Sequence, residues 1–512
     1  MKVSRFFEHW GLAENPFRAE EARRDTVFQR LDVDTSTHPD FDKILGELEH
    51  PSTSIVFGEK GSGKTAIRLQ LAKRIEAFND AHPSRRMFLI AYDDLNAGLD
   101  TFLASAERRR GDDDASLLRQ LRLVDHMDSI LHTAVVRIVD GVLGDPRSSK
   151  NAFGTDDAKR IKQSDATTKR DLLLLQSLYD RSEEAPSRTQ RLQRVLKAPG
   201  AKNRIVWEAM AGLGWIPAVG VYAYDRLLGI PGPYSELGLW LTYILGGLWL
   251  LAMLKWLLVD YTFRVAGLRR VSRRVSGQLR TLGRSMGSLS RSFSKLPRED
   301  IASSVLPTDD SDEPRYEMFD RLQRVLSVLG YTGVCVILDR VDEPTAVSGD
   351  PDRMRAVVWP MMNNKFLQLP GWGFKMLLPI ELRHLLFRES SAFFQEARLD
   401  KQSMIEQLGW SGATLYDLCN ARLRACQADG AESRALLDLF EDDVTQRDLV
   451  DSLDQMRQPR DAFKMLYQCI QEHCNLVTDE QEAWRIPRLV LEQVRKQQAD
   501  RVQQLFRGLR PA

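Results

Sequence analysis

The sequence has few cysteines, almost no net charge and no apolar leader. Its 512 residues include five cysteines, and 72 basic residues nearly balance 71 acidic ones, for a net charge of +1. So few cysteines predict no disulfide framework and fit a reducing compartment. The charge balance excludes a chain that is basic throughout, as many nucleic-acid-binding proteins are. The N-terminal residues MKVSRFFE contain no apolar stretch, so we expect no signal peptide there.

What the sequence does contain is one stretch that matches a phosphate-binding loop at every fixed position. Residues 58–65 read GEKGSGKT, which fits the pattern G-x-x-x-x-G-K-[ST]. A short apolar run at 54–57 precedes the loop, and residues 66–75 follow it with helical spacing. Because strand, loop and helix form the context that this motif requires, the sequence predicts a site for ATP with Mg²⁺.

Each residue type in this loop suits phosphate chemistry. Glycines let the backbone curl so that several N–H groups point inward, and the helix that follows presents its positive end. Lys64 is expected to contact the β- and γ-phosphates, and the Thr65 hydroxyl to bind Mg²⁺. The predicted nucleotide-binding residues are Gly58, Glu59, Lys60, Gly61, Ser62, Gly63, Lys64 and Thr65.

A second candidate motif lies much later in the chain. Residues 333–338 read GVCVIL and are followed by Asp339, as expected for a buried parallel strand that ends in an aspartate. Asp339 is expected to hold Mg²⁺ through water. Glu343, in preference to Asp342, is expected to orient and deprotonate the attacking water.

Residues 338–343, LDRVDE, resemble the extended Walker B pattern of NACHT-type STAND NTPases, and KAP-class membrane-associated NTPases have a related acidic cluster. The resemblance covers a minor part of the chain. It implies a P-loop NTPase core related to AAA+ proteins. A plain AAA+ protein has glutamate directly after the aspartate, where this chain has Arg340, so the identity of the catalytic carboxylate stays open.

Two arginines are candidate nucleotide sensors. Residues 371–380 are expected to form the next strand, and Arg383 after it is interpreted as a γ-phosphate sensor, with a plain surface arginine as the alternative. Residues 458–461, QPRD, resemble the helix start in the lid of origin-recognition-type AAA+ and KAP proteins. Proline at a helix start loses no hydrogen bond. The resemblance implies that Arg460 reaches the nucleotide; the alternative is a capped surface helix.

Two apolar runs, 209–224 and 237–254, predict a transmembrane hairpin. A span needs roughly 20 apolar residues, so both runs are near the minimum length. Basic residues flank both ends of the pair, whereas the turn between the runs contains a single arginine. This pattern predicts a two-pass protein of the inner membrane with both ends in the cytoplasm. KAP-class NTPases carry membrane helices inside the P-loop domain, which implies the same arrangement. The alternative is a pair of buried helices in a cytoplasmic protein.

The segment 261–295 contains arginines and lysines but no acidic residue, and its apolar residues recur in steps of three and four. This spacing predicts one long helix with an apolar stripe. Three roles are open for it: a stalk that packs within the insertion, a membrane-surface helix on anionic lipid, or a contact with nucleic acid.

Together these features predict an α/β chain with four parts and a membrane-anchored ATPase activity. We expect a homo-oligomer that acts as a nucleotide-driven switch on an effector protein; the family resemblance implies bacterial antiphage defence. The alternatives are a soluble origin-recognition-type AAA+ ATPase on DNA and a nucleotide-binding scaffold with little turnover. The predicted parts are the first half of a P-loop core with a parallel sheet (1–100), a helical insertion (101–330) with the hairpin at about 205–259, the second half of the core (331–395) and a helical lid (396–512).

Overall fold

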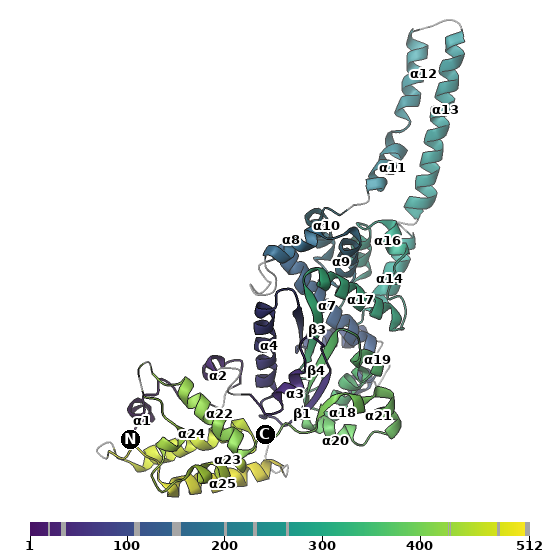
Figure 1. The fold of residues 1–512 in the computed structure, drawn as a ribbon. Coiled ribbons are helices and arrows are strands. Elements are labelled where there is room, and N and C mark those ends of the chain that lie inside the picture. Colours follow the sequence, from purple (N-terminus) through teal and green to yellow (C-terminus); the bar gives the residue numbers. More distant parts are fainter. Residues whose placement is uncertain are drawn as a thin grey trace. The chain divides into compact units, whose positions relative to one another are not determined.

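The computed structural model divides the chain into two compact units (Figure 1). Unit 1 combines Met1–Leu95 with Tyr331–Ala512, and unit 2 is Asn96–Gly330. The insertion therefore begins a few residues before the expected 101. The structure describes residues 1–18, 21–31, 37–106, 113–145, 155–198, 202–228, 233–262, 266–428, 430, 432–478 and 482–506.

Unit 1 contains a five-stranded, wholly parallel sheet in the order β2-β3-β4-β1-β5. This confirms the predicted α/β class with a parallel sheet. Because the strands are parallel, β1, β3 and β4 all deliver their carboxyl ends to one edge. The strands are β1 (Ser54–Gly58), β2 (Arg86–Tyr92), β3 (Tyr331–Leu338), β4 (Trp372–Pro379) and β5 (Ser403–Ile405).

Helices flank this sheet and bury its apolar residues. Ile67, Leu71 and Ile75 of α4 are buried in one cluster with Val56 of β1 and Leu377 of β4. The helix predicted from the spacing of residues 66–75 is therefore confirmed, and these three residues form its buried face. The helices of this part are α3 (Phe41–Leu45), α4 (Lys64–Ala81), α18 (Pro351–Val358), α19 (Asn364–Leu367), α20 (Ile380–Leu386) and α21 (Ser391–Ala397), with single 3₁₀ turns at Trp359–Met361 and Leu399–Lys401.

The C-terminal helices of unit 1 form a second core that also holds the N-terminal residues. Phe6 and Phe17 are buried in this core together with Leu415 and Leu466. Arg422 fixes the N-terminal segment, since its Nε donates to the carbonyl of Pro16 at 2.7 Å. The helices are α1 (Val3–His9), α2 (Thr26–Arg30), α22 (Gly412–Ala425), α23 (Gln446–Asp454), α24 (Pro459–Leu476) and α25 (Arg488–Phe506), with a 3₁₀ turn at Leu436–Leu439.

Unit 2 is helical throughout its described residues. Most side chains of its long helices α7 and α9 are buried. The helices are α5 (Asn96–Ser105), α6 (Asp114–Leu118), α7 (Leu123–Leu143), α8 (Thr155–Gln163), α9 (Ala166–Tyr179), α10 (Ala185–Leu196), α11 (Lys202–Leu213), α12 (Ile216–Leu228), α13 (Pro233–Lys255), a π-helical turn (Trp256–Tyr261), α14 (Leu268–Gln278), α15 (Met286–Phe293), α16 (Arg298–Ala302) and α17 (Glu313–Val328).

The single long helix expected over 261–295 is wrong. Within the described residues, α14 ends at Gln278 and α15 begins at Met286, and Gly283 between them has a φ of +57°. The break has a physical reason: it lets Arg280 and Arg284 turn toward the rest of unit 2. Arg280 Nε donates to Asp125 Oδ1 at 3.0 Å, and Arg284 Nη1 donates to the carbonyl of Ser182 at 3.1 Å.

The apolar runs of the insertion form α11, α12 and α13. Among the described residues, one helix is long and apolar enough to cross a membrane: Glu236–Leu258, with a mean hydropathy of 1.9 and little burial. The first run is divided, because α11 ends at Leu213 and α12 begins at Ile216. α12 packs beside α13 (Figure 1), and Trp249 Nε1 donates to the carbonyl of Ala211 at 2.9 Å. A two-pass membrane crossing stays a prediction.

Candidate functional site

A tight glycine loop joins β1 to α4 at the carboxyl edge of the sheet. Gly61 and Gly63 have φ angles of +99° and +97°, which residues with a Cβ rarely adopt. Ser62 Oγ donates to the carbonyl of Glu59 at 2.8 Å and closes the loop on itself. The strand, the loop and the helix thus have the order and the backbone conformation that the motif requires.

Lys64 is held inside this loop. Its Nζ donates to the carbonyls of Gly58 and Glu59, at 2.7 and 2.9 Å. Burial lowers the pKa of Lys64, and nearby carboxylates oppose that fall. The carboxylates of Asp342 and Asp339 have the largest opposing effects. Lys64 therefore lies where a glycine loop and carboxylates from other segments meet.

Thr65 and Asp339 lie together, as predicted. Thr65 Oγ1 donates to Asp339 Oδ2 at 3.4 Å, and Asp339 is almost fully buried, which raises the pKa of its carboxyl. Among the described residues, no group of three or more His, Cys, Asp or Glu side chains is placed to hold a metal ion. The pair nevertheless fits Mg²⁺, which proteins typically bind through one or two side chains while phosphates and waters complete the octahedron.

Arg68 also lies at this site, although the sequence motifs did not predict it. Its Nε lies 3.4 Å from Asp339 Oδ2, and its Nη1 lies 2.8 Å from Asp93 Oδ2. Arg68 therefore competes with Thr65 for the same carboxylate oxygen. The only available signal was its spacing of four residues from Lys64, which places both side chains on one face of α4.

The two candidate bases have different surroundings. Arg340, with a φ of +62°, pairs with Glu343 at 3.2 Å and also with Glu21. The side chain of Glu343 is 52% exposed, and it is absent from the main charges acting on Lys64. Asp342 has the largest effect among the carboxylates that act on Lys64. Asp342, the residue that the sequence ranked second, therefore acts more strongly on Lys64 than Glu343 does, and the choice of catalytic base stays a prediction.

Arg383 and Arg460 also differ. Arg383 Nη2 lies 2.7 Å from Glu406 Oε2, and its guanidinium stacks over the ring of Phe387. These partners fit the alternative of a plain surface arginine. Glu381 of the same helix, which the sequence reasoning did not single out, is among the carboxylates acting on Lys64.

Arg460 lies against the glycine loop. A Cβ placed on Gly61 would come within 3.2 Å of Arg460 Cβ and 2.9 Å of Gln458 Oε1. Gln458 Nε2 donates to the carboxylate of Glu59, whose pKa is raised by burial. The start of α24 therefore packs directly on the loop.

Trp410 also contacts the loop. Its indole Nε1 donates to the carbonyl of Ser62 at 2.8 Å. The ring of His38 meets Trp410 edge-on at 4.8 Å, and His38 Nε2 is 2.7 Å from the carbonyl of Gly409. Neither aromatic ring stands out in the sequence, because the contacts of both rings join distant segments.

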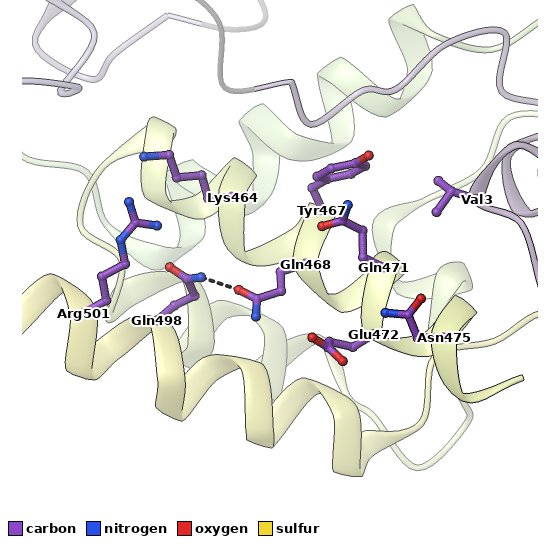
Figure 2. A pocket seen from close by; sticks show the side chains of 9 residues that line it. All are labelled: Val3, Lys464, Tyr467, Gln468, Gln471, Glu472, Asn475, Gln498 and Arg501. Carbon is purple, nitrogen blue, oxygen red and sulfur yellow. Dashed lines mark hydrogen bonds between the residues drawn. The ribbon is translucent and has the colours of Figure 1, made fainter.

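A separate polar cavity of about 520 Å³ lies between α24, α25 and α1 (Figure 2). Gln498 donates to Gln468 across it. None of the predicted site residues lines this cavity. Its lining consists of Val3, Lys464, Tyr467, Gln468, Gln471, Glu472, Asn475, Gln498 and Arg501.

Comparison of the chain with family models, with curated proteins and with solved structures found no match. The interpretation of the site therefore depends on its residues and their geometry.

Proposed function

We propose that this chain is a membrane-anchored ATPase whose nucleotide state acts as a switch. One observation carries the proposal: the glycine loop, with Lys64 and Thr65 at its end, meets Asp339 and Asp342 at the carboxyl edge of a parallel sheet. Ligands of open α/β sheets bind at this edge. A half-buried lysine beside a glycine loop and carboxylates suits a nucleoside triphosphate better than it suits a neutral ligand.

The proposed chemistry is phosphoryl transfer to water, which depends mainly on positioning and on charge stabilisation. Lys64 and the loop N–H groups stabilise negative charge on the phosphates. Thr65 and Asp339 would hold Mg²⁺, which supplies further positive charge when bound. Asp342 orients the attacking water and accepts its proton, in the role for which the sequence preferred Glu343.

The proposed switch uses the contacts between α24 and the loop. Gln458 binds Glu59, and Arg460 lies against Gly61, so a phosphate held by the loop changes the surroundings of both side chains. A helical lid that responds in this way transmits the nucleotide state to other parts of the chain. We further propose that the protein works as a homo-oligomer and acts on an effector protein.

The Lys64→Ala variant tests the enzymatic part. We expect ATP hydrolysis by the purified full chain to fall by two or more orders of magnitude, the usual scale for one charge-stabilising donor. Lys43→Ala is the matched control, because Lys43 is an exposed lysine of the same unit on α3. Wild-type turnover in Lys64→Ala would refute the assignment.

A second candidate function is a nucleotide-binding scaffold with little turnover. It is favoured by the ion pairs that hold Arg68 against Asp339 and Arg340 against Glu343. Turnover and nucleotide affinity measured on the same preparation separate the two: tight ATP binding with negligible hydrolysis would favour the scaffold.

Carbonate extraction of membranes tests the anchor. The proposal expects the chain to stay with the membrane, because the apolar side chains of α13 are largely exposed. Recovery of the intact chain in the soluble fraction would favour the DNA-associated ATPase.

A further inference from the structure

One face of α14 is an unusually dense patch of positive charge. Arg269, Arg270, Arg273 and Arg274 are all exposed. None of the four has an acidic partner among the residues that the structure describes. We call these four residues the arginine face.

The other arginines of this basic segment are used inside unit 2. Arg280 pairs with the buried Asp125, and Arg284 is 2% exposed with its guanidinium bonded to backbone carbonyls. The structure therefore divides the segment into arginines that hold the fold together and arginines that face outward. Only the second group is available to bind a ligand.

The apolar side of α14 is already covered. Leu268 is 3% exposed and Val275 is fully buried. A helix that lies in the membrane interface inserts its apolar face between the lipids, and α14 has no such face to offer. Any contact of α14 with a membrane must therefore be electrostatic and made by the folded helix.

The segment before α14 indicates what kind of anionic surface the arginine face meets. The candidate membrane span ends at Leu258, which is 59% exposed, and Tyr261 after it is 45% exposed. The rings of Trp256 and Tyr261 lie 5.6 Å apart. Aromatic residues followed by arginines are typical of the chain where it leaves a bilayer. We propose that the arginine face binds the anionic headgroups of phospholipids. This inference rests on the proposed membrane anchorage.

The experiment reconstitutes the full chain in vesicles of phosphatidylcholine alone or mixed with phosphatidylglycerol. Gly277→Cys supplies a label site on the arginine face: Gly277 is exposed, a Cβ there meets no atom within 4 Å, and all five native cysteines are buried. Energy transfer from this label to a headgroup-labelled phosphatidylcholine reports how closely α14 approaches the lipid surface.

We expect energy transfer to be larger in the anionic vesicles and to fall to the phosphatidylcholine level in about 0.5 M salt, because salt screens the attraction. Replacing all four arginines by glutamine should reduce the response to anionic lipid at least fivefold, since one arginine near such a surface contributes roughly a fivefold change in affinity. The control removes the same charge from exposed positions of unit 2, with Arg119, Lys162, Arg191 and Arg194 replaced by glutamine; it should respond like the wild type.

Three results would overturn the proposal: equal transfer in both kinds of vesicle, an unchanged response in the four-arginine variant, or a label that responds to duplex DNA but not to anionic lipid. The last result would assign the face to nucleic acid. Failure of the anchor is distinguishable, because carbonate would then extract the chain. In that case, the chain should still float with anionic vesicles in a salt-sensitive way, and the four-arginine variant should not. A chain that does not float with anionic vesicles would refute lipid binding by the arginine face.

Discussion

Both units bury charged side chains, but they arrange them differently. In unit 2, Asp128 and Arg315 are fully buried and lie 3.3 Å apart, and Tyr179 Oη donates to the same carboxylate at 3.1 Å. Arg188 pairs with Asp180 at 2.8 Å and with Asp140 at 2.6 Å. Each of these carboxylates is paired with a guanidinium, and we call these paired charges the closed network.

The charges around the glycine loop of unit 1 are less evenly matched. Lys64 gives its hydrogen bonds to two backbone carbonyls, while the carboxylates of Asp339 and Asp342 act on it through space. Burial shifts pKa values in both units, so a shifted pKa does not by itself identify a functional site. What distinguishes unit 1 is that its charges converge on a glycine loop at the carboxyl edge of a sheet.

The largest effect is expected from opening the closed network. Asp128→Ala leaves Arg315 buried without its carboxylate, which should lower the free energy of unfolding of unit 2 by about 3–5 kcal/mol. Urea unfolding of the full chain in detergent, with hydrogen exchange of peptides from α7 and α17, measures and localises the loss. ATP turnover of the folded fraction should be unchanged. A loss below about 1 kcal/mol would show that the buried Arg315 does not depend on the carboxylate of Asp128.

The next largest effect concerns the two carboxylates after β3. Asp342→Asn should slow ATP hydrolysis by about two orders of magnitude and preserve ATP binding, because a positioned base has an effect of this size. Glu343→Gln is the matched control, and we expect a much smaller effect because Arg340 holds Glu343 at 3.2 Å. Turnover and nucleotide affinity measured on both variants decide the question. The opposite order would identify Glu343 as the base, as the sequence pattern predicted.

The difference between the units also explains what the sequence could predict. The glycine loop is local, so its strand and its helix can be read from residues 54–81. A motif specifies Thr65 and Asp339 each, and the structure brings the two side chains within hydrogen-bond distance. No local motif predicts a role for Arg68, Glu381 or Trp410, because only the tertiary fold brings these residues to the loop.

The break between α14 and α15 was missed for a related reason. Apolar spacing continues through residues 279–285, but long-range partners decide the backbone there. Arg280 reaches Asp125 on α7, and Arg284 reaches Ser182. Local periodicity cannot show that two arginines will find hydrogen-bond acceptors inside a core.

A smaller effect is expected from Arg68→Gln, which removes one charge from the site of unit 1. Arg68 Nε lies 3.4 Å from Asp339, where a neighbouring positive charge opposes Mg²⁺ by about 1 kcal/mol even when water screens it well. The Mg²⁺ concentration that half-saturates ATP hydrolysis should therefore fall about fivefold. Arg85→Gln is the control, because Arg85 is an exposed arginine that pairs with Glu49. An unchanged or higher Mg²⁺ requirement in Arg68→Gln would mean that Arg68 does not compete for Asp339.

The smallest effect is a pH dependence of the closed network. Burial raises the pKa of Asp128 from 3.8 to about 6, against the opposing effect of Arg315. Because the folded state holds this proton more tightly than the unfolded state, the stabilisation is fully present below pH 3.8 and is lost as the pH rises through 6. Unit 2 should therefore lose about 1 kcal/mol of unfolding free energy between pH 5 and pH 7. Asp128→Asn keeps the size of the side chain but cannot titrate, so its urea-unfolding curves should lack this loss. Parallel pH profiles for the two proteins would show that Asp128 stays ionised beside Arg315 throughout this range.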